Sequence, residues 1–276
     1  MKKNKQIGLI YIFIWYDTFV RMFIDTHTHL FASEFDADRS QVIQNSIDAG
    51  VKKMFLPNVD VITLEPLKKT VAEFPNHCFP LLGLHPCSVT ENFEKDLKII
   101  RAEIDLKKPY GIGECGIDLY WDKTFLKEQK IALKIQGEWA KELKLPLIIH
   151  ARESFPEIFE VIDEINDENL TGIFHCFTGG EKEATKILSY GGFKMGIGGV
   201  VTYKTSHLPA LLPTIDLKNI VLETDSPYLP PVPYRGKRNE SAYLIKVAEK
   251  LAEIYHLPLD EIAKITTQNA NEIFKL

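Results

Sequence analysis

The stretch FIDTHTHL, residues 23–30, joins a short apolar run to two histidines that are one residue apart. Side chains alternate faces in an extended chain, so His27 and His29 should project to the same side. Two imidazoles placed in this way can bind one metal ion, can hydrogen-bond a shared partner, or can lie together without a function. A metal site would need further ligands at the same place.

The composition bounds the class of protein. The chain has 276 residues, of which 45% are hydrophobic and 26% charged, as in an ordinary globular protein with a large core. This length suits one α/β barrel of about 250 residues or two smaller domains. The net charge of −5 argues against a broad basic surface for nucleic acid but allows local binding of a few phosphates.

The cysteines indicate the compartment. They form no C-x-x-C pair and no zinc-finger spacing, so we expect reduced and mostly buried thiols in a cytoplasmic protein. The four are Cys78, Cys87, Cys115 and Cys176.

The N-terminal segment differs from the rest. It has a basic start and an apolar run over residues 7–16, as in the core of a signal peptide. However, no small-residue cleavage site precedes Asp17 and Arg21, and the run is too short to span a bilayer. We favour translation from Met22 over secretion. Residues 1–21 are then a dispensable extension that is not translated or is disordered, and residues 22–276 form a single domain.

After Met22 the sequence alternates between short β-branched or aromatic runs and longer stretches with helical periodicity. Helices are expected over about 38–50, with Asp38 as N-cap and Gln41 at the capping-box position, and over about 123–143, 241–255 and 259–274. Eight strands with intervening helices predict an α/β fold, the (β/α)8 TIM barrel. The predicted strands cover residues 22–26, 53–57, 79–84, 110–114, 147–150, 172–175, 193–196 and 220–223.

In such a barrel the chemistry takes place at the C-terminal ends of the strands. Five of the eight histidines fall at predicted strand ends, together with the carboxylates Glu114 and Asp225. Histidines scattered through a core would not choose this position so consistently, so the metal-binding alternative is favoured. The five are His27, His29, His85, His150 and His175.

This group is too rich for a single tetrahedral zinc and suits two divalent ions, which in such sites are about 3.5–4 Å apart. The first and eighth strands are neighbours in a closed barrel, so His27, His29 and Asp225 should hold one ion. The fifth and sixth strands should hold the other through His150 and His175. Glu114 lies between the two groups in barrel order and should bridge the ions with its two oxygens.

Residues deeper in the barrel are expected to support these ligands. Asp25 and Glu223 share the predicted inward faces of His27 and Asp225, and carboxylates at such positions commonly orient ligand histidines. For Glu223 a buried salt bridge is the alternative. Cys115 and Cys176 alternate with ligands along their strands and should face the helix layer.

Four basic or neutral side chains are candidates for substrate binding. His85, in GLHP, and Arg152, two residues after His150, should point toward the barrel mouth. Arg235 and Arg238 belong to a short basic cluster in PYRGKRNE and could bind phosphate. The alternative for this cluster is a solvated loop.

The motifs FIDTHTHL, GLHP, GIGECGIDLY, PLIIHARES, FHCFTGG, VLETDSPYL, RGKRNE and TTQNANEIF occur in this order from Met22 to the C-terminus. Together they resemble the TatD family of metal-dependent deoxyribonucleases, within the amidohydrolase-like superfamily. The resemblance implies a TIM-barrel metal hydrolase, often a 3′–5′ exonuclease on DNA, and the same six ligands. Two departures are Ser241, where the family often has proline, and residues 1–21, which have no counterpart.

The expected function is therefore cleavage of DNA phosphodiester bonds from single-stranded 3′ ends by a monomeric enzyme. Two ions of magnesium, manganese or zinc would activate the attacking water, with Glu114 as bridge and Asp225 as general base. Three alternatives use the same barrel. They are a lactone, amide or phosphotriester hydrolase, an aminoacyl-tRNA ester hydrolase, and a non-catalytic barrel with structural metal.

Overall fold

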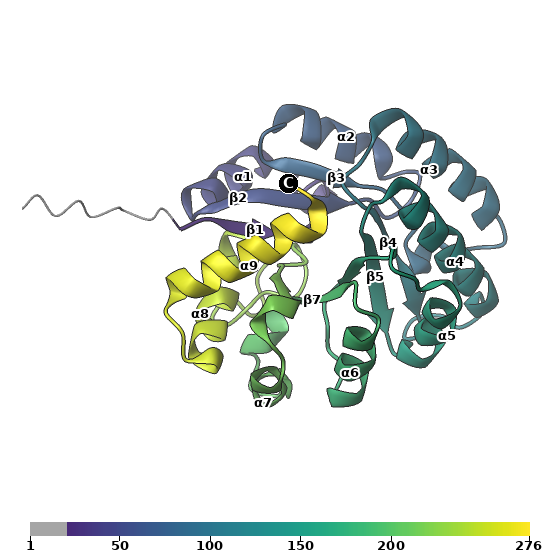
Figure 1. Cartoon of the computed structure of the whole chain (residues 1–276). Helices are drawn as coiled ribbons and strands as arrows, with labels where there is room; N and C mark the ends of the chain where they lie inside the picture. The colour runs from purple at the N-terminus through teal and green to yellow at the C-terminus, as the bar shows by residue number, and fades with distance from the viewer. Residues whose placement is uncertain (1–20) are drawn as a thin grey trace, which may run out of the picture.

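The computed structural model of the protein describes residues 21–276. Within this range it has eight strands, whose ends differ from the predicted ones by at most four residues (Figure 1). The strands are β1 (Phe23–Asp25), β2 (Val51–Pro57), β3 (Cys78–Leu81), β4 (Ile112–Asp118), β5 (Leu147–Arg152), β6 (Gly172–Phe174), β7 (Phe193–Ile197) and β8 (Ile220–Leu222).

Nine α-helices follow or flank these strands in the described part of the chain, and most lie outside them (Figure 1). They are α1 (Arg39–Asp48), α2 (Leu64–Glu73), α3 (Phe93–Lys107), α4 (Leu126–Leu143), α5 (Phe155–Ile165), α6 (Glu181–Ser189), α7 (Leu208–Leu211), α8 (Leu244–Tyr255) and α9 (Leu259–Phe274).

The strands are parallel and follow each other around the sheet in chain order. Continuous ladders join β1 to β3 and β4 to β8. Backbone hydrogen bonds also cross the two remaining gaps. Among them, Leu82 N–H donates to the Gly111 carbonyl at 3.1 Å, and Thr26 N–H donates to the Leu222 carbonyl at 3.0 Å. The fold is therefore TIM-barrel-like, which confirms the predicted class.

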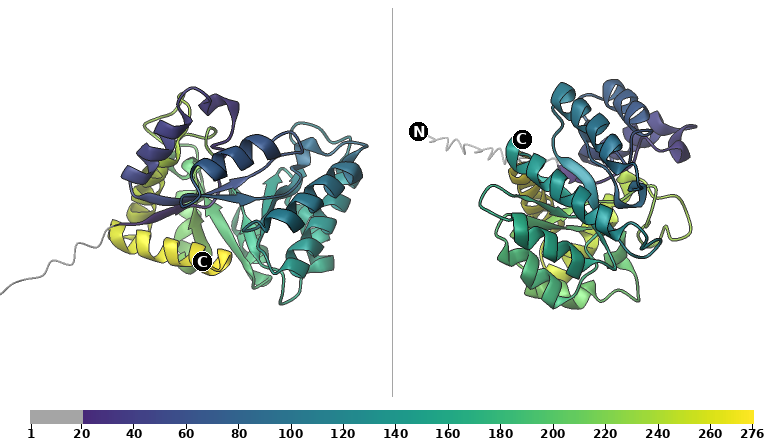
Figure 2. Two further views of the ribbon diagram at one scale, coloured as in Figure 1. Left: turned by 90° about the horizontal axis from the view of Figure 1, so that it is seen from above. Right: turned by 90° about the vertical axis from the view of Figure 1, so that its right-hand side faces the viewer.

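An apolar cluster fills one end of the barrel. Ile24, Phe55 and Val221 meet there, and α9 covers them with Phe274, whose ring stacks on Phe55 at 3.7 Å between centroids. In the left view of Figure 2, α9 (yellow) lies below the strands, and the loop after β1 (dark purple) lies above them. Because the lower end is packed with apolar side chains, the opposite end is the one available for polar chemistry.

The predicted cap of the first helix is wrong in its details. Helix α1 begins at Arg39, directly after Asp38, but the Asp38 carboxylate makes no capping hydrogen bond. It pairs instead with Arg238, and Gln41 donates to Asn45 one turn further along the helix. A local sequence pattern cannot anticipate a competing partner 200 residues away.

The start of the described chain packs against α9. Arg21 forms an ion pair with Asp260, and the Met22 carbonyl accepts a hydrogen bond from Thr267 Oγ1 at 2.7 Å. Arg21, which the sequence assigned to the extension, therefore contacts the domain. The rest of that prediction, residues 1–20, lies outside the described residues. None of the helices between residues 21 and 276 is both long enough and apolar enough to cross a membrane.

Candidate metal centre and substrate cavity

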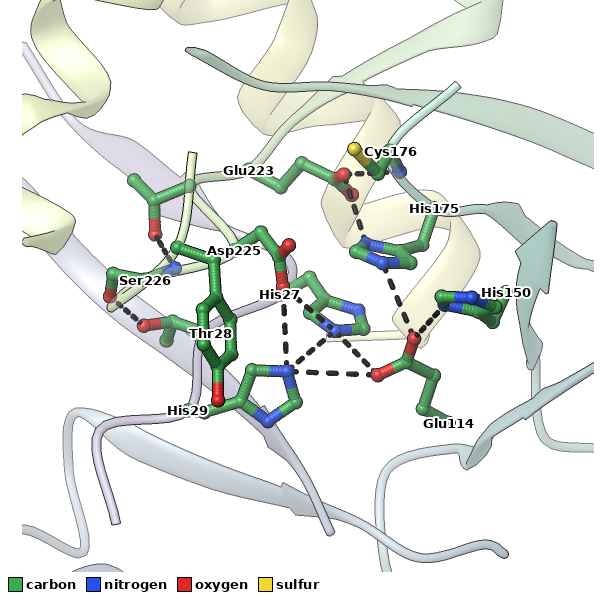
Figure 3. A network of polar contacts seen from close by, with 12 residues as sticks. His27, Thr28, His29, Glu114, His150, His175, Cys176, Glu223, Asp225 and Ser226 are labelled. Carbon is green, nitrogen blue, oxygen red and sulfur yellow. Dashed lines mark hydrogen bonds and ion pairs between the residues drawn. The ribbon is translucent and has the colours of Figure 1, made fainter. Parts of the chain in front are cut away.

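The six predicted ligands lie together at the C-terminal ends of the strands (Figure 3). Each comes from a strand or from the first residues after one, so the barrel holds their backbones. His27 and His29 follow β1, Glu114 is in β4, His150 is in β5, His175 follows β6, and Asp225 follows β8.

Four ligand atoms from β1, β4 and β8 converge on one point. His27 Nε2 and His29 Nε2 are 3.3 Å apart, and Glu114 Oε2 is 3.0 Å from the first and 3.6 Å from the second. Asp225 Oδ1 is 3.8 Å and 3.4 Å from the same two nitrogens. Four ligands at zinc-like distances in a tetrahedron would be about 3.4 Å from each other. The spacing therefore fits one bound cation.

The other oxygen of Glu114 faces a second group of histidines. Glu114 Oε1 is 2.8 Å from His150 Nδ1, 3.3 Å from His175 Nε2 and 3.4 Å from His85 Nε2. One buried carboxylate thus presents its two oxygens to two separate sets of nitrogen ligands. This is the arrangement that a bridge between two ions requires.

The electrostatics of this centre favour added positive charge. In the range 21–276, no Lys or Arg lies within ion-pair distance of Glu114, Asp118, Glu223 or Asp225. Although burial opposes it, the surrounding imidazoles hold the pKa of Glu114 well below its usual value. For His175 the signs are reversed. Burial acts to lower its pKa, but the carboxylates of Glu223 and Glu114 outweigh burial and raise the pKa to about 10. Divalent cations would compensate these buried carboxylates.

Glu223 lies where a carboxylate would orient a ligand imidazole. Its Oε1 is 3.1 Å from His175 Nδ1 and also accepts a hydrogen bond from the Cys176 N–H. Gly196 makes room for this carboxylate, because a Cβ at that position would lie 2.0 Å from Glu223 Oε2. Because Glu223 contacts Nδ1 of the ring, the other ring nitrogen of His175, Nε2, faces Glu114.

Asp25 does not orient an imidazole, contrary to the prediction. Its carboxylate accepts hydrogen bonds from the N–H and Oγ1 of Thr224 and from the His27 N–H. The reason is that β1 ends at Asp25, and Ile24, not Asp25, packs in the barrel interior. The alternation of faces therefore stops before His27. Asp25 instead ties the end of β1 to the end of β8, and burial raises its pKa to about 7.

Asp118 is a supporting residue that sequence reasoning missed. Its Oδ2 is 2.9 Å from His150 Nε2, and its Oδ1 accepts hydrogen bonds from the N–H groups of Tyr120 and Trp121. The signal was available in GECGID, because Asp118 stands four residues after Glu114 and four residues in a strand return to the same face.

The local backbone sets the tautomer of His85. Its Nδ1 accepts a hydrogen bond from the Cys87 N–H at 3.0 Å, so in the neutral ring the proton is on Nε2. Burial lowers the pKa of His85, which favours this neutral form. His85 therefore presents an N–H donor to the side of Glu114.

A cavity of about 1180 Å³ opens above the candidate metal ligands. Arg152 lines it, as predicted, and so do large exposed apolar side chains at its rim. Cys176 also lines the cavity, although we expected it to face the helix layer. Its φ of +46° breaks the strand geometry just after His175, whereas Cys115 remains in β4 and is buried among the strand–helix packing.

The structure contradicts the prediction that Arg238 binds substrate. Its guanidinium donates to both carboxylate oxygens of Asp38, at 2.9 and 2.7 Å, and also to Glu240 and to the Glu34 carbonyl. These contacts neutralise Arg238 and join the loop after β1 to the loop after β8. Arg235 differs, since it stacks over Tyr203 at 3.9 Å and has no carboxylate partner among the described residues.

The two arginines should therefore respond differently to substitution. Arg238→Ala removes a bidentate pair, and we expect it to lower the free energy of unfolding by about 1 kcal/mol, or the melting temperature by about 2–4 °C. Arg235→Ala removes one exposed stacking contact with Tyr203 and should lower the melting temperature less than Arg238→Ala does. Thermal unfolding of the two variants and the wild type checks this. Equal melting temperatures for all three would contradict the structural role of Arg238.

The known proteins that this chain resembles are metal-dependent hydrolases and nucleases, which agrees with a metal site at this place. The family model described as TatD related DNase matches residues 24–275. The uncharacterized metal-dependent hydrolase YabD of Bacillus subtilis is 35% identical over 92% of this chain and 100% of its own. A 3′-5′ ssDNA/RNA exonuclease TatD of Pantoea vagans is 28% identical over 91% and 99%.

A solved structure shows the same fold. The TatD homologue YjjV of Escherichia coli superimposes with a TM-score of 0.86 and 27% identity, covering 93% of this chain and 99% of its own. The family model spans most of the chain, so the resemblance noted in the motifs is confirmed. The chain belongs to the TatD related DNase family and is a metal-dependent hydrolase of that family.

Proposed function

We propose that this hydrolase cleaves phosphodiester bonds of DNA from single-stranded 3′ ends. The observation that carries the proposal is Glu114, whose two oxygens face two ligand groups at the floor of an open cavity. Two-ion sites of this kind suit the attacking and leaving oxygens of a phosphoryl group. The exonuclease name of a 28% identical relative supports the same substrate class.

The ligands divide between two positions. His27, His29 and Asp225 with Glu114 Oε2 would hold one divalent ion, and His150 and His175 with Glu114 Oε1 would hold the other. When bound, such ions act as Lewis acids on a phosphate and lower the pKa of water.

Other groups of the chain would move protons and hold the substrate. Asp225 is only partly buried and faces the cavity, so its carboxylate can accept a proton from the attacking water as general base. The His85 Nε2–H can donate to a phosphate oxygen or to the leaving 3′ oxygen. Arg152 lines the cavity and has no carboxylate partner among residues 21–276, so its guanidinium can bind phosphate.

The charge distribution favours binding at an end over binding along a duplex. The chain carries a net charge of −5, and Arg152 is the cationic side chain that the described structure places in the cavity wall. An end-binding enzyme of this type neutralises few phosphates. Its binding should therefore show a shallow salt dependence, equivalent to about one to three phosphate contacts.

The test is metal-dependent turnover on single-stranded DNA, duplex DNA, RNA, an aminoacyl-tRNA, a lactone and a phosphotriester. We expect stepwise shortening of single-stranded DNA from its 3′ end, abolished by a chelator and restored by Mg²⁺, Mn²⁺ or Zn²⁺. Internal cuts in circular DNA with a steep salt dependence would contradict an end-binding exonuclease. Turnover confined to the lactone, phosphotriester or aminoacyl-tRNA would overturn the proposal.

A further inference from the structure

Three side chains form a compact group at the edge of the cavity, and two of them, Trp121 and Arg152, line it. The Arg152 guanidinium lies over the Tyr120 ring at 3.9 Å and over the Trp121 ring at 5.4 Å from the centroids. The two aromatic rings meet edge to face at 4.9 Å. Trp121 is nonetheless 70% exposed and Tyr120 50% exposed. We call this group, Tyr120, Trp121 and Arg152, the rim platform.

The rim platform is not explained by packing of the fold. A tryptophan that stabilised the core would bury most of its surface, whereas Trp121 leaves its indole in solvent and lines the cavity. One exposed apolar side chain is ordinary, but several that gather at one cavity often mark a ligand-binding site. Tyr228, 52% exposed, and Ile62, 82% exposed, line the same cavity, so other parts of its wall are apolar as well.

A single carboxylate connects the rim platform to the metal centre. Asp118 Oδ1 accepts hydrogen bonds from the N–H of Tyr120 at 2.9 Å and of Trp121 at 3.3 Å, and its Oδ2 is 2.9 Å from His150 Nε2. Asp118 is buried, so this connection is shielded from water. The backbone that carries the two aromatic rings is therefore tied to the carboxylate that contacts His150.

We infer that Trp121 stacks on an unpaired base of the nucleotide whose phosphate reaches the metal centre, while Arg152 contacts the adjoining backbone phosphate. This inference rests on the proposed function and names how the substrate is held. Every base has a flat π-face, so an aromatic platform binds single strands with little sequence preference. A base inside a duplex is covered on both faces by its neighbours, which gives a physical reason for a preference for single strands.

The test combines a change in the enzyme with a change in the substrate. Trp121→Ala should raise KM for a single-stranded oligonucleotide by about 5- to 150-fold, the range that corresponds to losing one base–aromatic stack, with kcat little changed. Trp121→Phe should retain most of the affinity. Leu106→Ala is the matched control, because Leu106 is also 70% exposed but belongs to α3 and lies outside the cavity wall.

The second substrate is the same oligonucleotide without bases on its last two 3′ nucleotides. The wild type should bind it as weakly as Trp121→Ala does, and Trp121→Ala should show no further loss on it. An unchanged KM for Trp121→Ala, or an equal loss on both oligonucleotides, would overturn the stacking role while the proposed function stands. Failure of the wild type to hydrolyse either oligonucleotide would overturn the proposed function itself.

Discussion

Replacing Glu114 with alanine should release both metal ions together and reduce kcat/KM by at least about a thousandfold, since a metal ion contributes several kcal/mol of transition-state stabilisation. Glu114 is the one carboxylate in the described structure whose two oxygens face both histidine groups, at 3.0 Å from His27 and 2.8 Å from His150. Removing a ligand that belonged to only one group would weaken the binding of one ion and leave the other ion in place. The measurement is metal content by mass spectrometry, with turnover on the same samples.

Two further variants make this result interpretable. Glu114→Gln keeps the shape of the side chain and removes its charge, so a loss of metal in this variant cannot be attributed to a cavity in the site. Glu91→Ala removes an exposed carboxylate outside the cavity wall and should keep both ions and full activity. Retention of two tightly bound ions by Glu114→Ala would contradict the bridging role.

Replacing Asp225 with asparagine should reduce kcat by about 10²- to 10⁴-fold, because an amide cannot accept the proton that a general base removes from water. The contact of Asp225 with His29, 3.4 Å from Oδ1 to Nε2, belongs to the β1–β8 group. The ion held by Glu114, His150 and His175 should therefore remain. We expect metal content to fall by no more than the one ion of the β1–β8 group.

The Asp225 variant has its own control. Asp48→Asn makes the same chemical change on the exposed face of α1 and should leave kcat and metal content unchanged. Asp225 has a φ of +56°, a conformation that asparagine also tolerates, so the substitution should not disturb the loop. A kcat within a few-fold of the wild type would exclude Asp225 as the general base.

The sequence predicted the strands and the site for a common physical reason. Short β-branched runs mark buried parallel strands, and in a barrel these strands end at one mouth. Residues at the ends of separate strands, such as Glu114 and His150, are thereby brought together without any information on long-range contacts. The two histidines of FIDTHTHL do lie side by side, with their Nε2 atoms 3.3 Å apart.

The errors occur where the backbone departs from regular geometry or where a partner is distant in sequence. The alternation of faces predicted an inward Asp25, but β1 ends at that residue, before His27. A positive φ turned Cys176 into the cavity. The charge of Arg238 suggested phosphate binding, yet its carboxylate partner Asp38 is 200 residues away in the chain. The hydrophobic periodicity and the composition of the sequence do not show where a strand ends, where φ becomes positive, or which distant residue pairs with an arginine.

The most direct test of the central claim is anomalous X-ray scattering from crystals grown with Mn²⁺. We expect two peaks on either side of the Glu114 carboxylate. One should lie among His27, His29 and Asp225, and the other beside His150 and His175. A single peak, or two peaks of which one does not contact Glu114, would contradict the account.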